Sequence, residues 1–269
     1  MSRQKTQGKI LEQTEISPRI YSMWIQVQDI AREAKAGQFV SLFTGDGSKL
    51  LPRPISICEI DREAGKIRLV YRVTGKRTGT AILSEKQAGQ YVEIMGPLGN
   101  GFPLGRGRRP LLLGGGIGIP PMLQLAKDLK EAAEFEEKTG KEAVTVIAGY
   151  RDRLFLTEEL SACSHLYLAT EDGSAGSKGT ILDAIREKNL EGDVIYACGP
   201  TPMLQAVQTY ARERGILCYL SLEERMACGI GACLACVCGS REVDEHSRVK
   251  NKRVCKEGPV FEASEVEWL

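Results

Sequence analysis

Four cysteines near the end of the chain have the residue type and spacing that could hold an iron–sulfur cluster. Cys228, Cys233 and Cys236 follow a C-x4-C-x2-C pattern, and Cys255 lies further along the chain. Thiolates at this spacing typically hold the two irons of a [2Fe–2S] cluster. Gly229 lies in the first interval, where a residue without a side chain lets backbone N–H groups approach the sulfur atoms. The spacing therefore predicts a one-electron redox centre.

Zinc and disulfide chemistry are the other common uses of clustered cysteines. Structural zinc sites usually combine two C-x2-4-C pairs, whereas here one C-x4-C pair is followed by a nearby thiol and a distant one. Cys238 lies so close to Cys236 that either could be the third ligand. The x4-x2 spacing favours Cys236 and leaves Cys238 as a buried neutral thiol. Nine cysteines are an odd number, and no secretion signal precedes them, so a disulfide framework is not expected.

Length and charge limit the kind of protein that carries this motif. A chain of 269 residues can form two domains and an additional segment. It has 36 Lys and Arg against 35 Asp and Glu, so its formal charge of +1 provides no field to attract nucleic acid or an anionic membrane. No apolar run approaches a membrane span, and the first residues lack the apolar core of a signal peptide. We therefore expect a cytoplasmic protein.

The first part of the chain has the pattern of a small antiparallel β-barrel. Apolar and polar positions alternate over short stretches separated by turn residues. The candidate strands are Arg19–Val27, Gln38–Phe43, Lys66–Val73 and Tyr91–Met95. A stretch dense in glycine and proline, 96–103, closes this first domain, which we place at residues 1–105.

Two stretches of this domain suit a phosphate-bearing cofactor. In Arg53-Pro54-Ile55-Ser56, the guanidinium could bind a pyrophosphate and the hydroxyl could hydrogen-bond a flavin ring nitrogen. Gly79-Thr80 ends a glycine loop and leads into a short helix at 81–83, where free N–H groups favour phosphate. By itself, however, the first stretch also fits a surface loop and the second an ordinary turn.

From Pro110 onward, buried strands alternate with helices, the pattern of a parallel sheet covered on both faces. The strand Leu111–Leu113 runs into Gly114-Gly115-Gly116-Ile117-Gly118, and a helix that opens with proline continues to about Lys138. Such a turn can bind pyrophosphate, although it is not the strict G-x-G-x-x-G fingerprint and also fits a purely structural turn. We place this α/β domain at residues 106–220 and the cysteine segment at 221–269.

Further strands are expected at 143–149, 165–170 and 193–198, the last ending in Cys198-Gly199-Pro200. Ligands of open α/β sheets bind beyond the carboxyl ends of the strands, so this loop and the glycine turn can face one nucleotide. The only two histidines, His165 and His246, have no partners at metal or nucleophile spacing. We expect His165 at a strand edge and His246 in solvent.

In combination, these motifs resemble those of the ferredoxin–NADP reductase superfamily. They follow its order along the chain: Arg53–Ser56, Gly79-Thr80, Gly114–Gly118 and Cys198–Pro200 with Met203. The tail, from Leu222 through the cysteines to Phe261, is similar to one branch of that superfamily, the electron-transfer subunits of dihydroorotate dehydrogenase B. The resemblance covers nearly the whole chain, and the tail is its most specific part.

The resemblance implies a multidomain α+β protein with an FAD-binding β-barrel, an NAD-binding parallel-sheet domain and a C-terminal [2Fe–2S] segment. Arg53 would bind the flavin phosphates, Ser56 would lie beside the isoalloxazine ring, and Val70-Tyr71-Arg72 would flank it. The cluster ligands would be Cys228, Cys233, Cys236 and Cys255. The cofactor-binding residues expected are Arg53, Pro54, Ile55, Ser56, Val70, Tyr71, Arg72, Gly79, Thr80, Gly114, Gly115, Gly116, Gly118, Cys198, Gly199 and Pro200.

Three such sites in one chain could connect two-electron and one-electron chemistry, since nicotinamide transfers hydride, a cluster transfers single electrons and a flavin does both. Because the cofactors carry this chemistry, we expect no indispensable catalytic acid or base. No second substrate pocket is evident in the sequence, so we expect the final reaction to occur on a partner. By resemblance, the partner is the FMN-containing catalytic subunit that oxidises dihydroorotate to orotate in pyrimidine biosynthesis. Glu171 and Asp172 could favour NAD over NADP.

Two other functions stay open at this point. A diaphorase-like flavoprotein subunit of a hydrogenase or of a ferredoxin–NADP oxidoreductase complex would use the same sites with another partner, which co-purification would identify. A zinc-binding interaction protein would use the same four cysteines as structural ligands. Zinc without flavin would leave that protein colourless.

Overall fold

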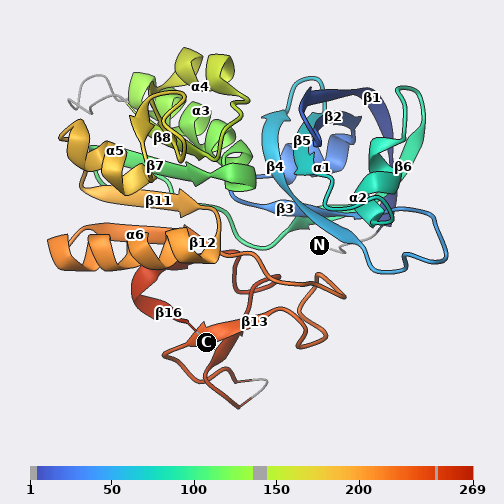
Figure 1. Cartoon of the computed structure of the whole chain (residues 1–269). Coiled ribbons are helices and arrows are strands. Elements are labelled where there is room, and N and C mark those ends of the chain that lie inside the picture. The colour runs from blue at the N-terminus through green and yellow to red at the C-terminus, as the bar shows by residue number, and fades with distance from the viewer. Residues whose placement is uncertain (1–4, 136–143, 246–247, 269) are drawn as a thin grey trace.

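The computed structural model describes residues 5–135, 144–245 and 248–268. These residues form a β-barrel, a mostly parallel sheet with helices on both faces, and a cysteine-rich C-terminal segment (Figure 1). The predicted fold class is thereby confirmed. The predicted helix end near Lys138, the first residue of the strand predicted at 143–149, and His246 lie outside the described residues.

The barrel is closed, in the order β1-β2-β5-β4-β3-β6, and its neighbouring strands are antiparallel. Its elements are β1 (Lys5–Ser17), β2 (Ile20–Gln26), α1 (Gln28–Glu33), β3 (Phe39–Phe43), β4 (Arg53–Asp61), β5 (Lys66–Arg72), α2 (Gly79–Ser84) and β6 (Tyr91–Leu98). The four predicted strands are confirmed as β2, β3, β5 and β6. The sequence analysis did not predict β1, α1 or β4. Arg53 begins β4 and does not lie in a surface loop.

The second unit is a sheet of seven strands in the order β10-β9-β8-β7-β11-β12-β15, parallel except for β15. Its strands are β7 (Pro110–Gly115), β8 (Thr145–Tyr150), β9 (His165–Thr170), β10 (Ser177–Lys178), β11 (Val194–Cys198), β12 (Leu217–Ser221) and β15 (Val260–Glu262). His165 is exposed at the start of β9, as expected.

Alternate side chains of β7 pack against helices on opposite faces of this sheet. Leu112 packs in a core with α3 (Pro120–Phe135) and α4 (Thr157–Cys163). Leu111 and Leu113 pack in another core with α5 (Ile181–Glu187) and α6 (Thr201–Arg214). Because both faces are covered, the strand needs apolar residues at consecutive positions, which explains the run of leucines.

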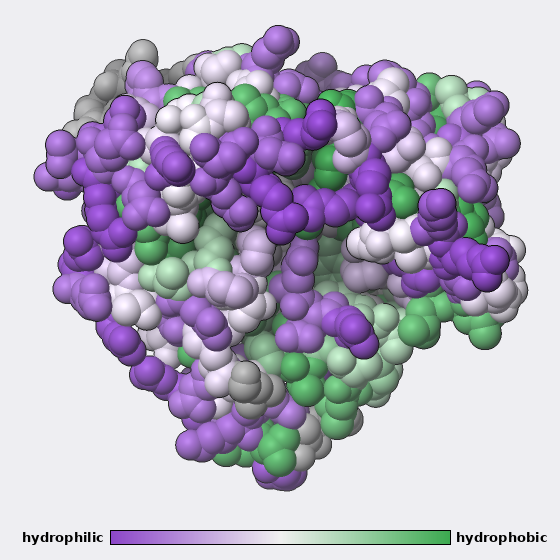
Figure 2. Space-filling model, viewed as in Figure 1, coloured by the Kyte–Doolittle hydropathy of each residue, from purple (hydrophilic) through white to green (hydrophobic). Residues whose placement is uncertain are grey.

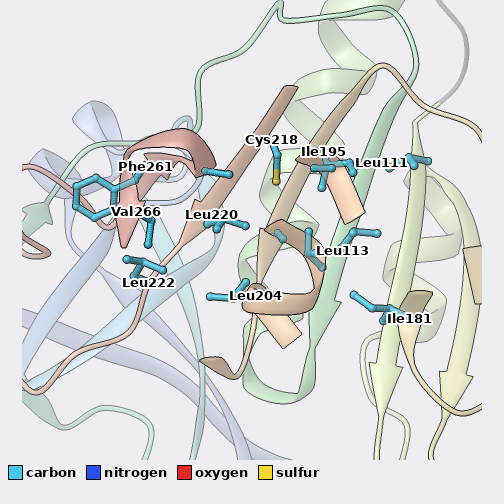
Figure 3. Packing of buried hydrophobic residues seen from close by; sticks show 14 of the residues in the cluster. Leu111, Leu113, Ile181, Ile195, Leu204, Cys218, Leu220, Leu222, Phe261 and Val266 are labelled. Carbon is cyan, nitrogen blue, oxygen red and sulfur yellow. The ribbon is translucent and has the colours of Figure 1, made fainter. Parts of the chain in front are cut away.

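The C-terminal segment is anchored to the same sheet. β15 pairs antiparallel with β12, and Phe261 and Val266 lie beside Leu220 and Leu222 in one core (Figure 3). The rest of the segment forms a small sheet of β13 (Val237–Ser240), β14 (Asn251–Arg253) and β16 (Val266–Glu267). None of the helices in the described ranges has the length and apolar character needed to span a membrane.

Candidate functional site

A cavity of about 520 Å³ lies where the barrel, the glycine-rich turn and the C-terminal segment meet. Figure 2 shows the surface hollowed between the barrel and the α/β unit. Seven of the residues expected to bind flavin line this cavity: Pro54, Ile55, Ser56, Val70, Tyr71, Arg72 and Thr80. Ile117 of the glycine-rich turn also lines it, so that turn borders the same space, although the residues expected to bind nucleotide are not among the lining residues.

The two stretches expected to bind phosphate contact each other. A side chain at Gly79 would overlap the Arg53 guanidinium, whose Cζ atom would lie 2.6 Å away. The position of that guanidinium is fixed by Nη1, which donates a hydrogen bond to the carbonyl of Leu51 at 2.7 Å. Thr78 caps the N-terminus of α2, and its hydroxyl oxygen lies 3.0 Å from that of Thr80. The arrangement joins a cation, hydroxyls and free N–H groups, which together suit a phosphate.

Tyr71 and Arg72 form one wall of the cavity. Tyr71 is buried, its hydroxyl donates to Oε1 of Gln13 at 2.9 Å, and its ring stacks on Tyr21 with centroids 6.0 Å apart. Arg72 is exposed and extends toward the glycine-rich turn, because a Cβ atom at Gly116 would lie 3.6 Å from its Nη2. The barrel and the α/β unit therefore share this wall.

The two loops expected to bind nucleotide meet at the carboxyl ends of adjacent parallel strands. Gly114 of β7 pairs with Cys198 of β11. A side chain at Gly118 would overlap the Cys198 carbonyl and would lie 2.6 Å from the backbone nitrogen of Gly199. All seven residues expected in these loops lie here: Gly114, Gly115, Gly116, Gly118, Cys198, Gly199 and Pro200. This is the position at which open α/β sheets bind their ligands.

The segment that joins β12 to the cysteines also lines the cavity, and the sequence reading did not anticipate this. Residues 221–226 contribute to its wall. The side chain of Glu223 is exposed to the open space of the cavity, but protein atoms surround it on its other sides. The resulting desolvation raises the pKa of its carboxyl, and the positive charge of Arg72 offsets part of this rise. The only sequence signal was the pair of glutamates shortly before Cys228.

The four expected ligand cysteines form two close pairs. Cys233 Sγ lies 3.3 Å from Cys228 Sγ, and the backbone N–H of Cys233 donates to the same sulfur at 3.4 Å. The thiol of Cys255 hydrogen-bonds to Cys236, and the N–H of Gly231 donates to Cys255 Sγ at 3.1 Å. Among the described residues, no three His, Cys, Asp or Glu side chains converge as they would around one ion.

Hydrogen bonds favour the thiolate form of one member of each pair. Burial raises the pKa of Cys228, but backbone N–H groups led by that of Cys233 outweigh this and lower the pKa to about 7. The hydrogen bond from Cys255 lowers the pKa of Cys236 to about 6, despite its burial. Thiolates are the form that binds metal.

Cys238 lies apart from these pairs. It is a residue of β13, and its thiol lies 3.5 Å from the carbonyl of Lys252, to which it donates. Burial raises its pKa to about 11. The geometry thus matches the expectation of a buried neutral thiol.

Behind the cysteines lies a buried cation that the sequence reading missed. Arg253 is 6% exposed, and its Nη1 donates to the carbonyl of Gly231 at 3.0 Å. Its Nη2 lies 2.6 Å from Glu257 and 3.5 Å from Asp244. Arg253 ends β14 (Asn251–Arg253) and Cys255 lies in the turn that follows, so these contacts fix the loop Cys228–Cys236, hereafter the cysteine loop, against the segment that carries Cys255.

Two family models match the chain. Residues 112–209 match the oxidoreductase NAD-binding domain. Residues 223–267 match the iron–sulfur cluster binding domain of dihydroorotate dehydrogenase B. The second match covers the cysteine loop, Arg253 and Cys255.

Similar proteins extend the match over nearly the whole chain. The electron transfer subunit of dihydroorotate dehydrogenase B (NAD+) from Geobacillus thermodenitrificans is 43% identical over 262 residues, 96% of each chain. That from Streptococcus thermophilus is 43% identical over 261 residues, again 96% of each. Among solved structures, the chain is similar to an NADH-dependent reduced ferredoxin–NADP oxidoreductase that was studied for flavin-based electron bifurcation. The two structures superpose with a TM-score of 0.84 and share 30% sequence identity, and the match covers 97% of this chain and 90% of that one. The chain therefore belongs to the family of oxidoreductase subunits that comprises the electron transfer subunits of dihydroorotate dehydrogenase B (NAD+).

Proposed function

We propose that this chain binds FAD, NAD and a [2Fe–2S] cluster, and carries electrons between an FMN-containing dihydroorotate dehydrogenase catalytic subunit and NAD+ in pyrimidine biosynthesis. One observation carries the proposal. Met226 lines the cavity, and Cys228, an expected cluster ligand, follows two residues later. Two residues of chain span at most about 7 Å, so cavity and cluster site are neighbours. This short separation suits electron transfer between them.

The residues of the barrel, 1–105, are proposed to hold FAD. Arg53 and the start of α2 at Gly79-Thr80 supply the charge and N–H groups for its phosphates. Val70, Tyr71 and Arg72 line the cavity and would flank its ring, and Ser56, which also lines the cavity, would hydrogen-bond a ring nitrogen.

The residues of the α/β unit, 106–220, are proposed to hold NAD. Gly114–Gly118 and Cys198–Pro200 pack closely, since a Cβ atom at Gly118 would overlap the Cys198 carbonyl. Both backbones therefore meet at the carboxyl ends of β7 and β11, where open α/β sheets bind dinucleotides. Glu171 and Asp172 follow β9 and are exposed at its carboxyl end. Their negative charge supports NAD over NADP, whose additional phosphate they would repel.

The residues from 221 to 269 are proposed to hold the cluster. In a two-iron cluster each iron takes two of the four thiolates, so two separate pairs, Cys228 with Cys233 and Cys236 with Cys255, suit it better than a single zinc ion. Gly231 donates its N–H to one ligand sulfur, and Arg253 holds the carbonyl of the same residue. These contacts orient the ligands, as outer hydrogen bonds do at other metal sites.

Flavin supplies the chemistry that couples hydride exchange with nicotinamide to single-electron exchange with iron–sulfur. The side chains described above bind and orient the cofactors, and none of them is required as a catalytic acid or base. All nine cysteines are free, which suits a reducing cytoplasm.

The catalytic subunit is proposed to form a hetero-oligomer with this chain and to exchange electrons at the cysteine loop. Ile230 and Leu234 of that loop are 42% and 46% exposed. Apolar side chains on a cofactor-bearing surface suit a protein partner.

The alternative partner is a hydrogenase or a ferredoxin–NADP oxidoreductase complex, and the likeness to the ferredoxin–NADP oxidoreductase structure at 30% identity is the observation that favours it. Co-purification distinguishes the two, since each partner is a different flavoprotein or metalloprotein. The relatives at 43% identity over 96% of the chain favour the dihydroorotate dehydrogenase partner.

An absorption spectrum with iron, zinc and flavin analysis of anaerobically purified protein tests the proposal. We expect flavin and iron in the protein, and bleaching of the flavin band and of the broader iron–sulfur band on addition of NADH. A flavin band that persists after NADH, or zinc in place of iron, would contradict it.

A further inference from the structure

The strand β3 has two faces with different environments. Val40 and Leu42 point into the barrel core. Phe39 points to the opposite face of the strand and packs in the core shared with the C-terminal segment. That core includes Cys236 and Cys255. Because side chains alternate along a strand, Ser41 points the same way as Phe39, toward the cysteines.

Ser41 is a polar residue at a position where an apolar one would be expected. Its side chain is 0% exposed, and within the described ranges its Oγ has no hydrogen-bond partner. A buried hydroxyl without a partner costs free energy, so such a group calls for a ligand that supplies the missing contact.

The nearest part of the C-terminal segment is the start of the cysteine loop. A Cβ atom at Gly229 would lie 3.1 Å from Ser41 Oγ, 3.5 Å from Leu98 Cδ1 and 3.7 Å from Met95 Cε. Leu98 and Met95 are apolar and offer the hydroxyl nothing to bond with. Gly229 has φ of +69°, a conformation suited to glycine, and follows Cys228 directly. The hydroxyl therefore lies under the backbone that presents the first thiolate.

We propose that Ser41 donates a hydrogen bond from its hydroxyl to a sulfur atom of the iron–sulfur cluster at the Cys228 end of the loop. The inference rests on the proposed function, because it requires the cluster. Ser41 is absent from the lining of the flavin cavity, whereas Phe39 lines it. The contact thus joins the flavin-side barrel to the cluster loop without reaching the flavin.

A donor at a cluster sulfur stabilises the more negative, reduced cluster and raises its reduction potential. Removing this donor should therefore make the cluster harder to reduce. An effect of up to tenfold in the one-electron equilibrium constant corresponds to about 59 mV.

The test is a redox titration of the complete protein, followed by electron paramagnetic resonance, for wild type, Ser41→Ala and the control Ser177→Ala. Ser177 is also buried without a side-chain hydrogen-bond partner in the described residues, but it lies in β10, at the sheet edge opposite β15. We expect a lower cluster potential in Ser41→Ala only, with unchanged iron content. The N–H groups of Gly231 and Cys233 also donate to ligand sulfurs and exchange in D2O, so they should contribute proton couplings in both proteins. Wild type should show one further exchangeable coupling, from the Ser41 hydroxyl, that is missing from Ser41→Ala.

Equal potentials and equal proton couplings in wild type and Ser41→Ala, with iron retained, would overturn the role of Ser41 and leave the proposed function intact. Absence of iron from wild type would instead refute the proposed function. If Ser41→Ala fails to fold, Ser41→Cys provides the comparison, because it keeps a side chain of similar size and replaces the hydroxyl with a weaker donor. A folded Ser41→Cys protein with the cluster potential and proton couplings of wild type would contradict the proposal.

Discussion

Replacing Gly118 with alanine should separate the two loops that are proposed to hold NAD. The new Cβ atom would overlap the carbonyl carbon and oxygen of Cys198 and lie 2.6 Å from the nitrogen of Gly199. All of these are backbone atoms at the end of β11, which pairs in register with β7, so none can rotate away. Overpacking of this kind costs about 1–3 kcal/mol. If the loops separate to relieve it, NADH affinity should fall roughly 5- to 140-fold.

Gly47→Ala is a matched control, because a Cβ atom there would have no neighbour within 4 Å and the residue has no positive φ. NADH dissociation constants from flavin reduction or calorimetry, with melting temperatures for both variants, provide the measurement. A melting temperature near that of wild type would show that Gly118→Ala is folded. A folded Gly118→Ala protein with wild-type NADH affinity would refute the view that this contact shapes the NAD site.

Three further predictions concern other parts of the chain. Cys236→Ser should lose iron, whereas Cys238→Ser should retain it, and metal analysis of both variants provides the measurement. Loss of iron from Cys238→Ser and not from Cys236→Ser would show that Cys238 is the third ligand. Arg253→Met leaves the carboxylates of Glu257 and Asp244 without their buried cation and should lower the free energy of unfolding by about 3–5 kcal/mol. The control Arg241→Met breaks an exposed pair with Glu267 and should change that free energy by under about 1 kcal/mol. Urea titrations of both variants provide the measurement. Desolvation raises the pKa of Asp193, but hydrogen bonds from two backbone N–H groups outweigh it and lower the pKa. The Asp193 carboxylate therefore contributes stability above its unfolded-state pKa of about 4, and this contribution is lost as the pH falls through the lower folded-state pKa. Asp193→Asn should destabilise the protein at neutral pH, and its difference from wild type should shrink below about pH 4; a difference that stays constant in acid would contradict this.

The geometry supports a simple account of how one chain can serve two kinds of electron transfer. Residues 221–226 line the cavity and lead into the cysteine loop, and β15 returns the chain to the sheet after Cys255. Both ends of the cysteine segment are therefore fixed to the α/β unit, while Gly229 packs on the barrel. A segment held at three places keeps the distance between its cofactor and the cavity constant, which electron transfer requires.

The local motifs could be predicted from sequence because each depends on residues close together in the chain. The spacing of Cys228, Cys233 and Cys236 is a property of one loop, and the glycines at 114–118 follow directly from the strand before them. The alternation of apolar residues likewise identified four of the six barrel strands, since side chains of a strand alternate between its faces. The family could be named from the order of these motifs alone.

Contacts between distant residues could not be predicted in this way. Nothing near Ser41 in the chain indicates that it lies beneath Gly229, and nothing near Arg253 indicates that it holds the carbonyl of Gly231. The pairing of β15 with β12 was missed for the same reason, because a strand of three residues carries little periodic signal. The sequence by itself determined which residues could bind flavin, nucleotide and iron. Only the tertiary structure decided how they meet, because that depends on packing between segments that lie far apart in the chain.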